Sequence, residues 1–256
     1  MKRHVVGAQM YTVREFCQDR AGVRASMEKV AKIGYTAIQV SGFGDVSAKE
    51  IGAIAADNGL KIVSSHMDWE RFMTDLDGII EDHQVWDCSH PAIGGIFRGY
   101  EGADGVKRFL DDLAPVALKL ASAGMDFSYH NHSHEFAKYG GVTWFQMMVD
   151  GSTAEQLKLE IDTYWVQHGG ADPAYWIRYC GKRQPLLHLK DMVITPQREQ
   201  RFGEIGQGNL NWASIFEAAE EVGVEWFLVE QDRSYERDPF ESLAISYRNL
   251  KEMGLS

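Results

Sequence analysis

The sequence predicts an α/β protein whose eight parallel strands close into a (β/α)8 TIM barrel. Short apolar runs alternate with longer segments of helical periodicity, which is typical of a parallel sheet covered by helices. Eight such pairs fit within 256 residues, about the length of one barrel domain. An open doubly wound sheet would have fewer strands and a glycine-rich nucleotide turn, and Gly42–Gly44 is too short for one. We therefore expect residues 1–256 to form a single domain.

The predicted strands recur at the intervals that successive βα units require. They are Val5–Met10, Tyr35–Val40, Lys61–His66, Pro91–Ile96, Asp126–His132, Lys158–Asp162, Leu186–Leu189 and Trp226–Glu230. The fourth strand contains a proline and two glycines, so its bounds could shift by several residues.

The predicted helices fill the gaps between the strands. They are Arg20–Ile33, Ala48–Asn58, Trp69–Val85, Gly105–Ala123, Val142–Val149, Pro173–Cys180, Trp212–Val222 and Pro239–Met253. Gly34, Gly59, Gly124 and Gly223 each follow a helical run, where a left-handed C-cap is expected. Asp172 precedes a proline, the usual order at a helix start.

Composition and charge exclude several classes of protein. Asp and Glu number 37 against 26 Lys and Arg, a formal net charge of −11, which argues against nucleic-acid or anionic-membrane binding. Cys17, Cys88 and Cys180 have no disulfide or zinc spacing, which favours a reducing compartment. The sequence shows neither a signal peptide nor an apolar run of membrane length. We therefore expect a cytoplasmic protein that binds a small molecule.

Titratable residues gather at the carboxyl ends of the last four predicted strands, the edge at which barrels of this kind bind ligands. Side chains alternate between the two faces of a strand, so residues two apart share a face. The pairs predicted to face the barrel interior are His130 with His132, Glu160 with Asp162, His188 with Lys190, and Glu230 with Asp232. Burying so many charges is costly unless they pair with one another or hold a cation.

The mixture of carboxylates and imidazoles suits one divalent metal ion, Mn²⁺, Mg²⁺, Zn²⁺ or Co²⁺. The predicted ligands are Glu135, Asp162, His188 and Glu230. Strict alternation places Glu135 opposite His130 and His132, so it can join only if the chain bends after the fifth strand. Without that bend, one of the two histidines takes its place. A salt-bridge network without metal is the alternative.

Six segments resemble, in order and spacing, the xylose-isomerase-like TIM barrels, which include sugar (phosphate) isomerases and epimerases, inosose dehydratases and AP endonucleases. They are QMYTVR, YHNHSHEF, LEIDTYW, HLKDM, GEIGQGNLNW and LVEQD. The resemblance spans nearly the whole chain and implies a metal held by Glu, Asp, His and Glu from the later strands. Asp162, His188 and Glu230 match that pattern. His130 stands where many members have Glu, so His130 and Glu135 compete for one role.

The resemblance does not extend to DNA repair. AP endonucleases of this fold carry an additional histidine three residues after the aspartate, which DTYW lacks, and the chain is acidic. The implied partner is a small sugar or sugar derivative, with no nucleic acid and no membrane, and a homo-oligomer stays open.

The implied activity is a metal-dependent sugar isomerase or epimerase in carbohydrate metabolism, acting on a keto-sugar through an enediolate. The alternatives are a dehydratase or lyase of a keto-sugar or 3-keto-glycoside, and a non-catalytic sugar-binding barrel. His132, Glu160 and Lys190 are candidates for proton transfer or oxyanion stabilisation. The candidate substrate-binding residues are Gln9, His66, His130, Trp165 and Arg201. Arg201 lies in the segment Thr195–Asn211, which we expect to act as a lid.

Overall fold

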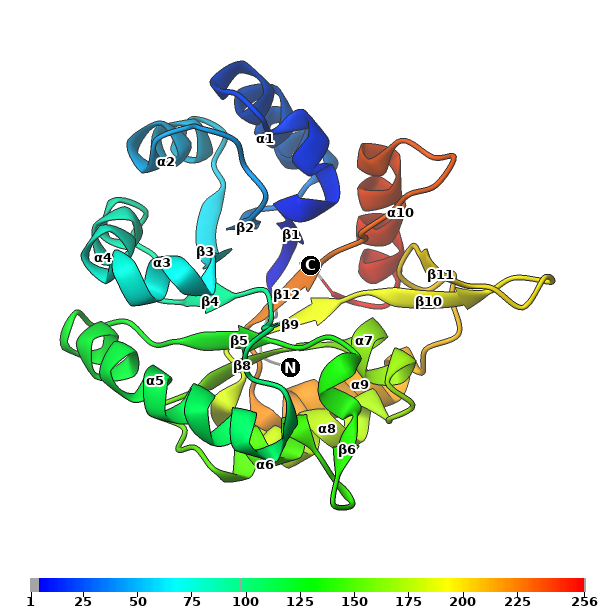
Figure 1. Ribbon diagram of the computed structural model, residues 1–256. Helices are drawn as coiled ribbons and strands as arrows, with labels where there is room; N and C mark the ends of the chain where they lie inside the picture. The colour runs from blue at the N-terminus through cyan, green and yellow to red at the C-terminus, as the bar shows by residue number, and fades with distance from the viewer. Residues whose placement is uncertain (1–4, 97, 256) are drawn as a thin grey trace.

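The computed structural model describes residues 5–96 and 98–255. Eight parallel strands form a closed barrel in the order β1-β12-β9-β8-β5-β4-β3-β2, and the helices stand around its outside (Figure 1). The predicted (β/α)8 barrel is confirmed. The barrel strands are β1 (Val5–Gln9), β2 (Ala37–Val40), β3 (Lys61–His66), β4 (Pro91–Ile93), β5 (Ser128–His130), β8 (Lys158–Asp162), β9 (Leu186–Leu189) and β12 (Trp226–Val229).

The helices largely follow the predicted segments. The α-helices are α1 (Arg20–Ile33), α2 (Ala48–Asp57), α3 (Trp69–Thr74), α4 (Leu76–Val85), α5 (Gly102–Ser122), α6 (Trp144–Asp150), α7 (Thr163–His168), α8 (Pro173–Cys180), α9 (Trp212–Val222) and α10 (Pro239–Glu252). The 3₁₀ helices are η1 (Met10–Phe16), η2 (His134–Phe136) and η3 (Gly181–Arg183). Gly34, Gly59, Gly124 and Gly223 all have positive φ, which confirms their predicted place at helix ends. The Asp172 side chain accepts from Tyr175 N at the start of α8.

The segment predicted as one helix over Trp69–Val85 is two helices. Asp75 breaks it with a non-helical φ of −143° and ψ of 49°, and its carboxylate accepts a hydrogen bond from Gly78 N to start α4. An aspartate competes for nearby backbone N–H groups in this way, which ends one helix and caps the next.

Two antiparallel hairpins and α7 were not predicted. All but one of their elements lie in segments that the sequence analysis left without regular structure; the exception is the strand Val142–Thr143, which occupies the start of the predicted helix Val142–Val149. The first hairpin joins β6 (Lys138–Tyr139) to β7 (Val142–Thr143), and the second joins β10 (Asp191–Ile194) to β11 (Gln200–Gly203). In Figure 1 the second hairpin projects outward from the barrel. Part of the expected lid segment Thr195–Asn211 is therefore an ordered hairpin.

The barrel interior is filled in layers. Apolar side chains fill the lower layer: Ala37, Val63, Leu186 and Leu228. Polar side chains fill the layer above it, where Gln9, Gln39, Ser64 and Glu160 are fully buried. Intervening residues such as Leu159, Ile161 and Leu187 belong to the main apolar core beneath the helices, as alternation predicts.

The three cysteines are buried and free. None of the helices in the described part of the chain is long and apolar enough to cross a membrane.

Burial of His83 couples stability to pH. Its Nδ1 lies 2.7 Å from the carbonyl oxygen of Ile79 and its Nε2 lies 2.7 Å from Ser65 Oγ, so α4 is tied to β3. Burial lowers the pKa of His83 from 6.5 to about 4. The unfolded chain therefore takes up this proton first, so the contribution is complete above pH 6.5 and is lost as the pH falls toward 4.

We expect His83 to make the protein about 2 kcal/mol less stable at pH 5 than at pH 7. Urea unfolding of the native protein and of His83→Gln at both pH values measures this, because other groups titrate equally in both proteins. Equal losses of stability in the two proteins would contradict the assignment.

Candidate functional site

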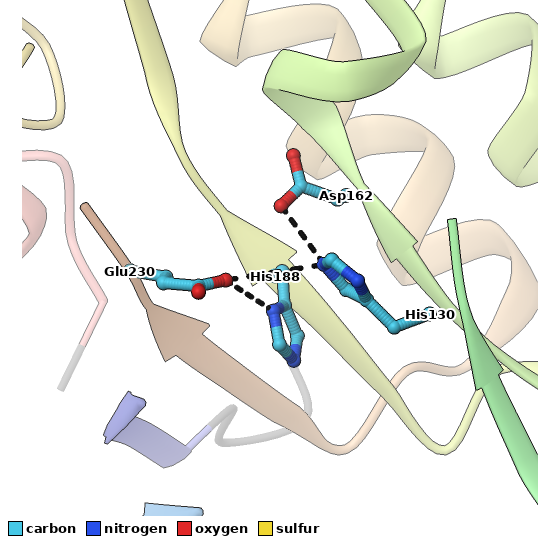
Figure 2. A group of neighbouring side chains, drawn as sticks. All are labelled: His130, Asp162, His188 and Glu230. Carbon is cyan, nitrogen blue, oxygen red and sulfur yellow. Dashed lines mark hydrogen bonds and ion pairs between the residues drawn. The ribbon is translucent and has the colours of Figure 1, made fainter. Parts of the chain in front are cut away.

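Four titratable side chains from neighbouring strands meet at the carboxyl end of the barrel (Figure 2). His130 lies on β5, Asp162 on β8 and His188 on β9, while Glu230 directly follows β12. All four are buried, and one potential ligand atom from each lies within 4.8 Å of the other three. We call these residues the four-residue group. Two carboxylate oxygens and two imidazole nitrogens form a donor set that suits a divalent metal ion, so the group can hold one.

Direct contacts join the members of this group. Asp162 Oδ2 lies 3.1 Å from His130 Nε2, and Glu230 Oε2 lies 2.8 Å from His188 Nδ1 and 3.9 Å from His130 Nε2. The other Asp162 oxygen accepts from Trp165 N at the start of α7, which fixes the orientation of the carboxylate. Burial lowers the pKa of His130 to about 4, so this imidazole is neutral near pH 7 and can act as a ligand.

Lys190 lies beside the group and neutralises its carboxylates. Its Nζ is 3.0 Å from Asp162 Oδ2, 3.0 Å from Glu230 Oε2 and 3.1 Å from Asp232 Oδ1. Burial alone would lower the pKa of Lys190, but these three carboxylates raise it above its ordinary value. The lysine therefore stays protonated and pairs with these carboxylates.

Glu160 lies below the group, in the buried polar layer. Its Oε2 is 2.8 Å from His66 Nε2 and 3.4 Å from His188 Nε2, and it accepts from Gln39 Nε2 at 2.9 Å. Its Oε1 accepts from Ser64 Oγ at 2.6 Å. Burial would raise the pKa of Glu160, but the bonds to His188 and His66 hold it below its ordinary value. This carboxylate is surrounded by donors and orients two histidines.

Glu135 does not join the four-residue group, although it was one of the predicted ligands. The chain does bend after β5, into η2, but Glu135 Oε1 accepts from Tyr129 Oη at 2.8 Å and Oε2 accepts from His132 N at 2.9 Å. Tyr129 packs in the apolar core outside the barrel, so it draws the carboxylate away from the barrel axis. His130 occupies the place that the sequence left open between these two residues.

A pocket of about 600 Å³ opens above the group. Its lining combines aromatic, cationic and acidic side chains with two neighbouring glycines of the β4 loop: Tyr11, Arg14, Ser41, Gly42, His66, Met67, Asp68, Trp69, Gly94, Gly95, His130, His132, Glu230, Asp232 and Arg233. A cavity of this size suits a small molecule. Burial and the charges of Glu230 and Asp162 raise the pKa of Asp232, on the pocket wall, to about 7.

Only some of the predicted substrate-binding residues line this pocket. His66 and His130 do. Gln9 is fully buried below it and donates to Gln39 Oε1 at 2.7 Å. Trp165 is not part of the lining and packs against His132, with ring centres 5.1 Å apart and ring planes tilted by 42°. Arg201 lies on the projecting hairpin and pairs with the Glu199 carboxylate at 2.8 Å.

His132 also lines the pocket but is not a member of the four-residue group. Gly95 makes room for it. The glycine has a φ of +109°, and a Cβ there would lie 2.9 Å from His132 Nδ1, so both backbone conformation and space require glycine. The result is an imidazole at the pocket wall beside the candidate metal ligands.

Sequence reasoning missed two arginines of the pocket, Arg14 and Arg233. Arg14 lies in η1, directly after β1, and Arg233 lies in the loop after β12, so position at the carboxyl edge could have found them. Neither residue lies on a strand, so neither shows the alternation of polar and apolar residues that identified most of the other candidates.

Asp191, next to Lys190, anchors the loop that leads to α9. Its Oδ1 accepts from Met192 N at 2.8 Å and Leu210 N at 3.3 Å. Its Oδ2 accepts from Gly206 N at 2.9 Å, Gly208 N at 3.0 Å and Trp212 Nε1 at 2.8 Å. One fully buried carboxylate thus satisfies five donors.

We expect Asp191→Asn to lower the free energy of unfolding by about 2 to 3 kcal/mol, because the amide places N–H groups against backbone donors. Urea unfolding at pH 7 measures the loss. Asp172→Asn is the matched control, since Asn caps a helix about as well as Asp. If both variants lose the same small amount, Asp191 does not anchor the loop.

The fold and the site define a TIM barrel with a buried group of side chains able to hold a metal ion, and a sequence comparison identifies the family. The family model described as xylose isomerase-like TIM barrel matches residues 27–253. The chain therefore belongs to the xylose isomerase-like TIM barrel family, as its motifs suggested. No curated protein sequence matches it.

Solved structures of similar proteins share the whole fold. A sugar phosphate isomerase/epimerase from Parabacteroides distasonis superposes with a TM-score of 0.81 at 25% identity, covering 98% of this chain and 94% of that one. A probable 3-DHS dehydratase, AsbF of Bacillus anthracis, gives 0.72 at 12%, covering 97% and 98%. The IOLI protein, which holds a zinc atom, gives 0.71 at 12%, covering 96% and 97%. The last two likenesses establish the common fold alone.

Proposed function

We propose that this protein is a divalent-metal-dependent sugar isomerase or epimerase that acts on a keto-sugar through an enediolate. The observation that carries this proposal is the convergence of His130, Asp162, His188 and Glu230 beneath a pocket of about 600 Å³. Membership of the xylose isomerase-like family supports it, as does the likeness to a barrel named sugar phosphate isomerase/epimerase.

The four-residue group would hold the metal. When bound, the ion would supply Lewis-acid stabilisation of the negative charge that develops on the sugar when a C–H proton leaves. The choice between Mn²⁺, Mg²⁺, Zn²⁺ and Co²⁺ stays open, because a mixed oxygen and nitrogen donor set accepts all four.

His132 is the group that we propose to move the proton. It lines the pocket, it lies next to the four-residue group, and its ring is held between His130 and Trp165. A neutral imidazole at this place can accept a proton from a substrate carbon and return it to the adjacent carbon, as isomerisation requires. Epimerisation would need a second group that protonates the same carbon from the opposite face. Lys190 keeps the carboxylates of Asp162 and Glu230 charge-compensated.

Glu160 is better described as a positioning residue than as a general base. Both of its oxygens already accept hydrogen bonds from side chains below the pocket, and it does not belong to the described pocket lining. A carboxylate that binds the far nitrogen of a metal-ligating histidine fixes its tautomer and ring orientation. We propose this role for Glu160 toward His188.

Hydrogen exchange tests the proposal directly. The protein is loaded with Mn²⁺ in deuterated buffer, and mass spectrometry follows deuterium entry into ketoses and 3-keto-sugars. Enzyme-dependent exchange at a carbon beside the carbonyl supports the proposal. Tight sugar binding without exchange would instead indicate a non-catalytic barrel, and loss of water or release of an aglycone would indicate a dehydratase or lyase on the same site.

A further inference from the structure

We infer that the substrate carries an anionic group, a carboxylate or a phosphate ester, which Arg14 and Arg233 bind at the pocket wall. This inference rests on the proposed function, because it assumes that the keto and hydroxyl oxygens of the substrate lie at the four-residue group. Both arginines line the pocket, Arg14 from η1 directly after β1 and Arg233 from the loop after β12. The inference is supported by the charge of the two arginines, by the space beside Gly42 and by the contacts that fix Arg14.

Neither pocket arginine is neutralised by the protein. Among the described residues, no carboxylate oxygen lies within 4.0 Å of the guanidinium of Arg14 or Arg233, whereas Arg71, Arg178 and Arg201 each have such a partner. A guanidinium at a concave site without a carboxylate partner is suited to bind an anionic ligand. Two of them on one pocket wall make such a ligand the simplest way to balance their charge.

Arg14 is held in a fixed position. Its Nη1 donates to the carbonyl oxygen of Tyr11 at 2.8 Å, and both Nη atoms donate to the carbonyl oxygen of Asp232 at 3.3 Å. Its guanidinium carbon lies 4.0 Å from the centre of the Tyr11 ring. These acceptors carry no net charge, so they orient the guanidinium without compensating it, and an oriented donor loses little freedom on binding a ligand.

Gly42 allows this wall to form. It has a φ of +70°, and a Cβ there would lie 2.9 Å from Arg14 Cβ and 3.0 Å from Tyr11 Cδ2. Only glycine lets the β2 loop approach Arg14 and Tyr11 so closely. All three residues line the pocket, so the close approach places the arginine beside the ligand space.

The acidic residues of the pocket have other partners or lie elsewhere on the wall. Glu230 belongs to the four-residue group, and Asp232 pairs with Lys190 at 3.1 Å. Asp68 is an exposed side chain in the loop before α3. A neutral sugar would leave the charges of both guanidinium groups uncompensated. An anionic sugar would compensate them while its keto and hydroxyl oxygens reach the four-residue group.

Calorimetry on the Mn²⁺-loaded protein tests the inference with three ligands of one carbon skeleton: D-fructose, D-fructose 6-phosphate and D-fructuronate. We expect at least one anionic ligand to bind about tenfold more tightly than D-fructose, as charge-assisted hydrogen bonds imply. Arg233→Gln and Arg14→Gln should each remove most of that preference. Arg248→Gln, an exposed arginine on α10 outside the pocket lining, should keep it and controls for net charge.

The outcomes separate the two proposals. Preference for the phosphate ester or for the uronate identifies which anion the wall accepts. Equal binding of all three ligands, or a preference that survives Arg233→Gln and Arg14→Gln, overturns the inference, while deuterium exchange into D-fructose would leave the proposed function intact. If none of the ligands binds and no ketose exchanges, the proposed function fails and the inference fails with it. Arg233 is exposed, so its variant folds even if Arg14→Gln does not.

Discussion

Glu230→Gln is expected to weaken Mn²⁺ binding by roughly 100-fold or more, because it replaces a charged oxygen ligand by a neutral amide in a group of four. The carboxylate also contacts His188 Nδ1 at 2.8 Å and Lys190 Nζ at 3.0 Å, so the amide would disturb two further members of the site. Calorimetric titration of metal-free protein with Mn²⁺ measures the change in Kd.

Glu135→Gln is the matched control for this change. Glu135 is also a buried glutamate beside the β5 strand end, but its oxygens contact Tyr129 Oη and His132 N. We expect its Mn²⁺ affinity to stay within about twofold of the native value, since remote contacts contribute little to coordination. If Glu135→Gln loses the metal as Glu230→Gln does, the sequence-based ligand set, which contains both glutamates, is right; if Glu230→Gln keeps the metal, both ligand sets are wrong.

The comparison between these two glutamates shows what the sequence could predict. The period-two alternation of β8 and β9 placed Asp162, His188 and Lys190 on the inner face, and all three lie there. Glu135 lies beyond a strand end, where alternation no longer holds. Its direction is set by the hydroxyl of Tyr129, a tertiary contact with no local signal in the sequence.

The fold, like parts of the site, was predictable from the pattern of apolar and polar residues along the chain. Parallel strands buried on both faces leave long apolar runs, and glycines with positive φ mark the ends of helices such as α1 and α9. The β10–β11 hairpin was not predicted, since its buried residues do not alternate with exposed ones: burial decreases from Asp191 and Met192 at its base to the exposed Ile194 and Gln200 at its tip. The pocket arginines lie outside the strands, Arg14 in η1 and Arg233 in the loop after β12, where side-chain directions follow from packing rather than from periodicity.

His132→Asn is expected to reduce the rate of enzyme-dependent deuterium exchange by about 100-fold or more, the range that removal of a general base commonly causes. The variant keeps a polar side chain of smaller size at the pocket wall but removes the basic nitrogen. Because His132 is not one of the four proposed ligands, Mn²⁺ affinity should change by less than about tenfold. The two measurements together separate proton transfer from metal binding.

His134→Asn provides the matched control, because this neighbouring histidine is exposed and lies outside the described pocket lining. Its Nε2 lies 2.9 Å from the carbonyl oxygen of Ile96, so its loss should affect the β4 loop and leave exchange within about threefold of native. An unchanged exchange rate in His132→Asn would remove the imidazole from the reaction. Asp232, on the pocket wall after β12, would then be the next group to test as the proton carrier.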